Sequence, residues 1–168
     1  GCGSQVAGII AAYNPLWDAQ RDEIECFEEA VALALTILRK KFEVFFAVQR
    51  AYEEVSAALA AQKRGIVELK RFAPWKQRLI PSKAKFVVFP SQRGGYCAQA
   101  IAAGFGTQEL KVPFPAEWAG APEEDLPGIS GIETLRFCHV GRFLVTVGTR
   151  EDAFAACEAA MERAREDG

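Results

Sequence analysis

The 168-residue sequence contains a single histidine, His139. Metal-hydrolase centres commonly use two or more histidines, so this scarcity excludes most such sites from the chain. Its five cysteines are scattered, odd in number and without a C-x-x-C pair, which disfavours both a disulfide framework and a zinc knuckle and favours a reducing compartment. We therefore expect the chain to bind or shape something rather than to carry a complete active site.

Several targeting and cofactor signals are also missing. Charges interrupt even the apolar region 30–48, so no run of about 18 uncharged apolar residues occurs and we predict no membrane-spanning helix. The first ten residues lack the basic and apolar segments of a secretory signal, and we interpret them as a cut end of a longer protein. Gly104-Phe105-Gly106 does not complete a G-x-G-x-x-G motif and no P-loop is present, so the sequence supports no nucleotide cofactor.

Charge is unevenly distributed, although the net charge is only −2. Residues 63–93 contain nine basic residues and one acid, Glu68, so this segment carries +8 and the remainder of the chain carries −10. Aromatic residues are interleaved with these cations, so the segment could offer charge to phosphates and ring faces to bases. Alternatively, the rings fill the core and the lysines lie at strand edges. The basic residues are Lys63, Arg64, Lys70, Arg71, Lys76, Arg78, Lys83, Lys85 and Arg93, and the aromatic residues are Phe72, Trp75, Phe86, Phe89 and Tyr96.

The first third of the sequence predicts helices. A short helix is expected over 5–12, ending before Asn14-Pro15, because a residue that precedes proline is biased out of the α region. After Asp18, apolar residues recur every seven positions and predict a helix of about 40 residues, continuous or else bent or split within 41–48. This stripe could form a coiled-coil seam between subunits, but we favour packing on the domain's own sheet. The series is Ile24, Val31, Leu38, Phe45, Tyr52 and Leu59, with Phe27, Ala34, Val48 and Val55 in a second row.

After Gly65 the pattern changes to alternation with a period of two, which predicts strands. Prolines at the first position predict short helical turns at 74–79 and 115–119, and Gly94-Gly95 permits a tight reversal between two strands. A final helix is expected over 150–165, with Thr149 as its N-cap and Asp152 completing a capping box. The prediction is an α+β fold, with a mixed or antiparallel sheet of about five strands covered by a long N-terminal helical region and a C-terminal helix. The expected strands are 66–70, 84–89, 96–102, 135–140 and 143–147.

The single histidine directly follows a cysteine in an expected strand. Neighbouring side chains in a strand point to opposite faces of the sheet, so Cys138 and His139 cannot form a nucleophile–base pair with each other. We expect Cys138 to be a buried small hydrophobe. His139 could contact a phosphate or carboxylate, or it could be a hydrogen-bonded residue at a strand end. The acids at 123–125 are interpreted as a solvated surface loop.

Nine motifs, spread over nearly the whole chain, resemble the C-terminal half of the Myg family in the same order. That family is also catalogued as metal-dependent protein hydrolases and belongs to the DHH phosphoesterases. The motifs are Asn14-Pro15-x-Trp17, Phe27-Glu28-x-Ala30, Pro74-Trp75-Lys76, the strand from Phe86 to Pro90, Gln99, Pro115-x-x-Trp118-x-Gly120, Ile129-Ser130-Gly131-Ile132, Phe137-Cys138-His139 and Thr149-Arg150-Glu151-x-Ala153.

The resemblance implies a two-domain enzyme. An N-terminal DHH domain would bind a divalent metal, Mn or Mg, through aspartates and histidines, and residues 1–168 would form a single C-terminal, substrate-binding domain similar to DHH-associated domains. The family is associated with 3′–5′ exonuclease action on RNA and with the mitochondrion and nucleus. Since this chain has no Asp-His-His or Asp-x-Asp motif, we expect it to hold no cofactor and to be inactive alone. The implied partners are RNA or another phosphodiester and the protein's own DHH domain. The apolar stripe leaves a homodimer as an open alternative, and we expect no membrane partner.

The resemblance also implies seven substrate-binding residues. Lys76 and Arg150 would neutralise phosphate, and Thr149 with the first amides of its helix would form an anion site. Gln99 and His139 would donate or accept hydrogen bonds, Trp75 would stack on a base or pack, and Arg93 would contact substrate. One departure weakens this expectation, because Val145-Thr146 stands where the family commonly has Gly-Gly, and glycine permits close backbone approach. The full set is Trp75, Lys76, Arg93, Gln99, His139, Thr149 and Arg150.

Two functions therefore remain open. The first is the substrate-binding half of a nuclease, which predicts that the cations of 63–93 share one concave face with Arg150. The second is a non-catalytic interaction module that dimerises through the long helix, which predicts dispersed cations and an exposed apolar stripe.

Overall fold

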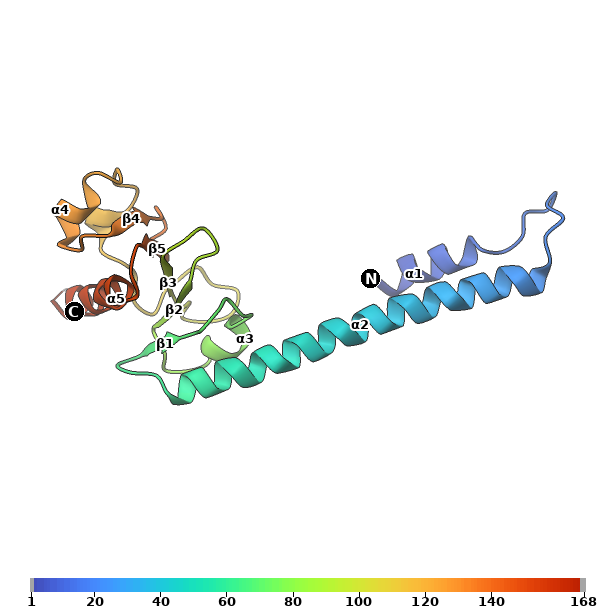
Figure 1. The fold of residues 1–168 in the computed structure, drawn as a ribbon, viewed down its shortest axis with the longest axis horizontal. Helices are drawn as coiled ribbons and strands as arrows, with labels where there is room; N and C mark the ends of the chain where they lie inside the picture. Colours follow the sequence, from blue (N-terminus) through green and yellow to red (C-terminus); the bar gives the residue numbers. More distant parts are fainter. Residues whose placement is uncertain (1, 167–168) are drawn as a thin grey trace. The chain divides into compact units, whose positions relative to one another are not determined.

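The computed structural model describes residues 2–166 and divides the chain into two compact units, with the boundary after Gln49. The first unit contains α1 (Cys2–Ala11) and most of α2 (Glu23–Ala60), a helix of 38 residues. As Figure 1 shows, α2 continues without interruption through residues 41–48, so the continuous form of the expected long helix is correct and the split form is wrong. Within the described residues, α1 ends before Asn14-Pro15, as predicted.

The second unit is built on a five-stranded mixed sheet, which confirms the predicted α+β class. Its strand order is β1-β2-β3-β5-β4, with β1 parallel to β2 and every other neighbouring pair antiparallel. All five expected strands are present, each shortened or shifted by one or two residues at one or both ends. The strands are β1 (Ile66–Glu68), β2 (Phe86–Pro90), β3 (Tyr96–Ala100), β4 (Leu135–Cys138) and β5 (Leu144–Val147).

One side of the sheet packs against α5 (Arg150–Glu166), the expected C-terminal helix. The buried face of α5 consists mainly of small side chains, and it contacts Phe86, Val88 and Val145 of the sheet. Two short helices, α4 (Leu126–Ser130) and η1 (Ala116–Trp118), complete the same core. Of these two, only η1 was predicted from the sequence. Cys138 is fully buried here, as expected, and burial raises the pKa of its thiol to about 11, so it is an inert core residue.

The other side of the sheet forms a second core around β1 and β2. Val67 and Val87 pack there against Val55 from the last turns of α2 and against Trp75, which precedes α3 (Lys76–Leu79). The expected packing of the heptad stripe on the sheet therefore holds only for the last turns of α2. Stripe residues between Ile24 and Val48 are largely exposed.

A half-buried lysine ties together the segment that leads into β2. Lys111 donates hydrogen bonds from Nζ to three main-chain carbonyl oxygens, those of Leu79 at 3.2 Å, Ser82 at 2.6 Å and Ala84 at 3.0 Å. Main-chain carbonyls withdrawn from water need such partners. Lys111 is thus a structural cation, which the sequence did not distinguish from other surface lysines.

Candidate functional site

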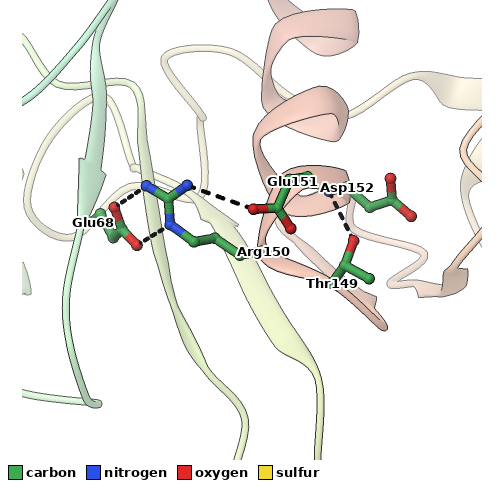
Figure 2. Close-up of polar contacts among 5 residues, drawn as sticks. All are labelled: Glu68, Thr149, Arg150, Glu151 and Asp152. Atoms are coloured by element: carbon green, nitrogen blue, oxygen red, sulfur yellow. Dashed lines mark hydrogen bonds and ion pairs between the residues drawn. The ribbon is translucent and has the colours of Figure 1, made fainter.

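The start of α5 carries two of the residues expected to bind substrate, Thr149 and Arg150. Thr149 is the N-cap, because its Oγ1 accepts a hydrogen bond from the amide of Asp152 at 3.2 Å, as predicted (Figure 2). The reciprocal half of the expected capping box is replaced, since the Asp152 carboxylate accepts hydrogen bonds from the amide and hydroxyl of Thr134. Thr134 in turn accepts a hydrogen bond from the amide of Gly148, so the β5–α5 connection is held at two points.

The guanidinium of Arg150 is engaged by a carboxylate. Its Nε and Nη2 donate to the two carboxylate oxygens of Glu68 at 2.5 and 2.6 Å, and Nη1 lies 3.9 Å from Glu151 (Figure 2). The guanidinium also lies over the ring of Phe154, 4.7 Å from its centroid. The hydrogen bonds from Arg150 hold the pKa of Glu68 below its usual value. A phosphate would therefore compete with Glu68 for this cation.

Glu68 is the partner that the sequence reasoning missed. It lies 82 positions from Arg150, so no local pattern links the two residues. The available signal was its isolation as the single acid among nine cations between residues 63 and 93. The two residues meet because α5 packs on the side of the sheet that Ile66, two residues before Glu68 on β1, also faces.

The opposite side of β3, β5 and β4 forms a surface that we call the open face, defined by Cys97, Gln99, Phe137, Leu144 and Thr146. Alternation along β3 and β5 places their members opposite the α5 core. The register pairs Gln99 with Leu144 and Thr146 with Cys97, and Phe137, which follows an irregularity in β4, pairs with Thr146. Phe137 is exposed and the other four are half-buried. The open face therefore offers an aromatic ring beside a hydroxyl on the neighbouring strand, with an amide one strand further across the sheet.

His139 lies at the edge of the open face, just beyond β4. Its ring centroid is 6.3 Å from that of Phe137 and 4.2 Å from that of Phe143. Nδ1 accepts a hydrogen bond from the amide of Gly141 at 2.9 Å, which leaves Nε2 as the donor of the neutral ring. The geometry makes His139 a half-buried hydrogen-bond donor flanked by aromatic rings.

A hollow of about 390 Å³ adjoins the open face at Cys97. Phe72 and Phe89 line it with their rings in edge-to-face contact, 5.3 Å between centroids, and Arg93 lines it from the turn between β2 and β3. This turn is the predicted reversal, with Gly94 and Gly95 both at positive φ. Arg93 is exposed, so its charge borders both the hollow and solvent.

The seven expected site residues divide into separate groups. Gln99 and His139 lie at the open face and Arg93 beside it, whereas Thr149 and Arg150 lie at the start of α5. Trp75 is only 5% exposed and belongs to the second core, so its ring packs rather than presenting a stacking surface. Lys76 is exposed at the first position of α3.

The cations of residues 63–93 also lie on both sides of the sheet. Arg64 pairs with Glu158 of α5, whereas Arg71 pairs with Glu54 of α2. Arg78 donates to Ser56 of α2, on the same side as Arg71. The expectation that this whole segment shares one concave face with Arg150 is therefore not met. Only a subset, with Arg93 nearest to the open face, is available to a ligand on that side.

Residues 2–166 have two further properties that bear on function. No group of three or more histidine, cysteine, aspartate or glutamate side chains in this part of the chain is placed to hold a metal ion. No helix among the same residues has the length and apolar character needed to span a membrane.

Comparison with known proteins gave consistent matches. Residues 2–161 match the family model MYG1_exonuc, described as "Uncharacterised protein family (UPF0160)". The chain is 29% identical over 170 residues to a MYG1 protein of Dictyostelium discoideum, and the match covers 90% of this chain and 51% of the relative. It is 30% identical over 181 residues to a MYG1 protein of Chlamydia pneumoniae, covering 95% of this chain and 55% of the relative. It is 27% identical over 168 residues to MYG1 exonuclease of Homo sapiens, covering 90% of this chain and 45% of the relative. The chain thus spans about half the length of the curated relatives it matches. No solved structure matches it.

Proposed function

This chain belongs to the MYG1_exonuc family (UPF0160), and from that premise we propose that it is the substrate-binding lobe of a DHH-type, metal-dependent exonuclease that degrades RNA from the 3′ end. The name of its human and mouse relatives, MYG1 exonuclease, supports nuclease chemistry. In this proposal, Mn or Mg is bound by a separate DHH domain of the parent protein. The parent protein then acts in the mitochondrion or the nucleus.

The observation that carries the substrate-binding role is the open face. Proteins that bind single-stranded nucleic acid commonly stack bases on exposed aromatic rings and hydrogen-bond their edges from neighbouring polar groups. Phe137 supplies an exposed ring, the Nε2–H of His139 lies beside it, and Gln99 supplies a hydrogen-bonding group two strands away on the same face. The adjoining hollow adds the ring of Phe72 and the charge of Arg93. We assign single-stranded RNA to this surface.

The start of α5 receives a different role in the proposal. Arg150 is neutralised by Glu68, so its first effect is to join α5 to β1. In this proposal, Thr149 and the free amides of the first turn of α5 bind an anionic group of the substrate by donating hydrogen bonds to it. Their contribution to binding is proposed to be smaller than that of the open face.

RNA binding by this chain tests the proposal. Fluorescence anisotropy with a labelled single-stranded oligoribonucleotide should show binding that weakens steeply with salt. Phe137→Ala should weaken it by about 5- to 100-fold, the range expected when one stacked base is lost. Arg93→Ala should lower the slope of log affinity against log salt by about one, because one phosphate contact is lost.

Phe105→Ala is the matched control, because Phe105 is also an exposed phenylalanine but lies outside the open face. It should leave the RNA affinity unchanged. Equal affinities for the original chain and for both the Phe137 and Gln99 alanine variants would contradict the assignment to the open face.

A further inference from the structure

The first unit leaves a long apolar stripe on α2 without a partner. From Ile24 to Phe45 the stripe occupies one side of the helix, since steps of three and four residues keep its members within an arc of about 100°. The side chains are strongly exposed, with Phe27 at 69%, Leu35 at 61% and Phe42 at 52%. Contiguous apolar surface of this kind marks an interaction site.

The stripe has an internal symmetry that favours a second copy of α2 as its partner. Its members are arranged symmetrically about the point between Ala34 and Leu35, so that a residue numbered i has an apolar counterpart at 69 − i. A second copy of α2 running in the opposite direction would therefore meet apolar side chains of matching position along the whole stripe. The matched pairs are Ile24 with Phe45, Phe27 with Phe42, Val31 with Leu38 and Ala34 with Leu35.

Charge along α2 favours the same antiparallel arrangement. The helix begins with a block of acids that includes Glu28, and its middle carries the cations Arg39, Lys40 and Lys41. In an antiparallel pair centred between Ala34 and Leu35, Glu28 of one copy lies opposite Lys41 of the second copy. Arg39 of the second copy is two residues away from that position along the helix. Glu28, Arg39 and Lys41 form no ion pair within the described residues. A parallel pair would instead place the acids opposite acids.

The groove between α1 and α2 offers space for the second copy. It has a volume of about 840 Å³ and is lined largely by small or apolar residues, including Ala7, Ile10, Ala30, Val31 and Ala34. In the same arrangement, the stripe residues of the second copy that lie level with this groove include Leu38, Phe42 and Phe45. Large side chains entering a surface of small ones give the interdigitated packing of protein interiors.

From these features we propose that two copies of this chain associate through antiparallel pairing of α2, with a twofold axis passing between Ala34 and Leu35. The two α1–α2 hairpins then form a four-helix arrangement with an isologous interface. The proposal does not rest on RNA binding, because all of its contacts lie in the first unit and the open face lies in the second.

Sedimentation equilibrium of the 168-residue chain tests the association. The chain should be dimeric, and the double variant Val31→Glu with Leu38→Glu should be monomeric with unchanged helix content by circular dichroism. Thr36→Glu is the matched control, because Thr36 is exposed on the side of α2 away from the stripe, and it should remain dimeric. A monomeric original chain, or equal dissociation of the control, would overturn the proposal.

Cysteine cross-linking tests the direction and the register. Leu35→Cys lies next to the proposed axis and should form a disulfide with its own copy under mild oxidation. Phe45→Cys should not, because the two cysteines would be about 32 Å apart along the helices, far beyond disulfide reach. A mixture of Ile24→Cys and Phe45→Cys should give the heterodimer instead. The unmodified chain, oxidised in the same way, controls for the native cysteines, and self-linked Phe45→Cys would overturn the antiparallel arrangement.

Discussion

Replacing Trp75 with alanine distinguishes a core role for this residue from a role in substrate binding. The indole is 5% exposed and packs in the second core, with Leu79 and Val87 among the residues of that cluster. A buried tryptophan removes about 150–250 Å² from water, and at about 25 cal/mol/Å² this corresponds to about 4–6 kcal/mol. The alanine that remains recovers part of this value. We therefore expect the free energy of unfolding to fall by about 3–5 kcal/mol.

Urea unfolding followed by far-ultraviolet circular dichroism measures the loss, read from the transition of the second unit. Trp75→Phe should cost less, about 1–2 kcal/mol, because most of the apolar volume is retained. Phe72→Ala provides the comparison on an exposed ring. Phe72 is 56% exposed and makes one edge-to-face contact with Phe89, so its loss should cost about 0.5–1.5 kcal/mol.

The result that would refute this reasoning is an unchanged unfolding midpoint for Trp75→Ala. If that variant also lost RNA affinity while remaining as stable as the original chain, the ring would be a ligand contact and not a core residue. A large loss of stability in Trp75→Ala, with RNA affinity preserved in the folded Trp75→Phe variant, is the expected outcome.

Two further predictions concern charged groups in the second unit. Because Arg150 lowers the pKa of Glu68 from its usual 4.5 in the folded chain, this pair stabilises the fold fully above that pH, and its contribution is lost as the pH falls through the lower folded-state pKa. Thermal melts at several acidic pH values should show this loss, and Glu68→Gln should remove that part of the pH dependence; identical profiles for both chains would contradict it. Lys111→Met leaves three main-chain carbonyl oxygens without their donor, so it should lower the free energy of unfolding by about 1–3 kcal/mol in urea titrations. Lys83→Met should change it little, because Lys83 is exposed and its side chain makes no hydrogen bond to residues 2–166.

Much of the architecture could be anticipated from local patterns. The heptad series predicted a single long helix, the period-two segments predicted all five strands, and Thr149 was identified as the cap of the last helix. These features depend on neighbours within a few residues, which repeat visibly in a sequence. The helix α4 was missed, because five residues are too few to show a period.

The composition of the candidate site depended on contacts between distant segments. Residues 68 and 150 form their ion pair because α5 packs on the side of the sheet that Glu68 of β1 faces, and no spacing in the chain encodes that contact. On the opposite side of the sheet, packing of the last turns of α2 over β1 and β2 buried Trp75, whereas Gln99 and Phe137 lie on the part of that side that forms the open face. A sequence records which residues can face the same way along one helix or strand, but which side of a sheet receives a covering helix is settled by how several elements bury their apolar surface together.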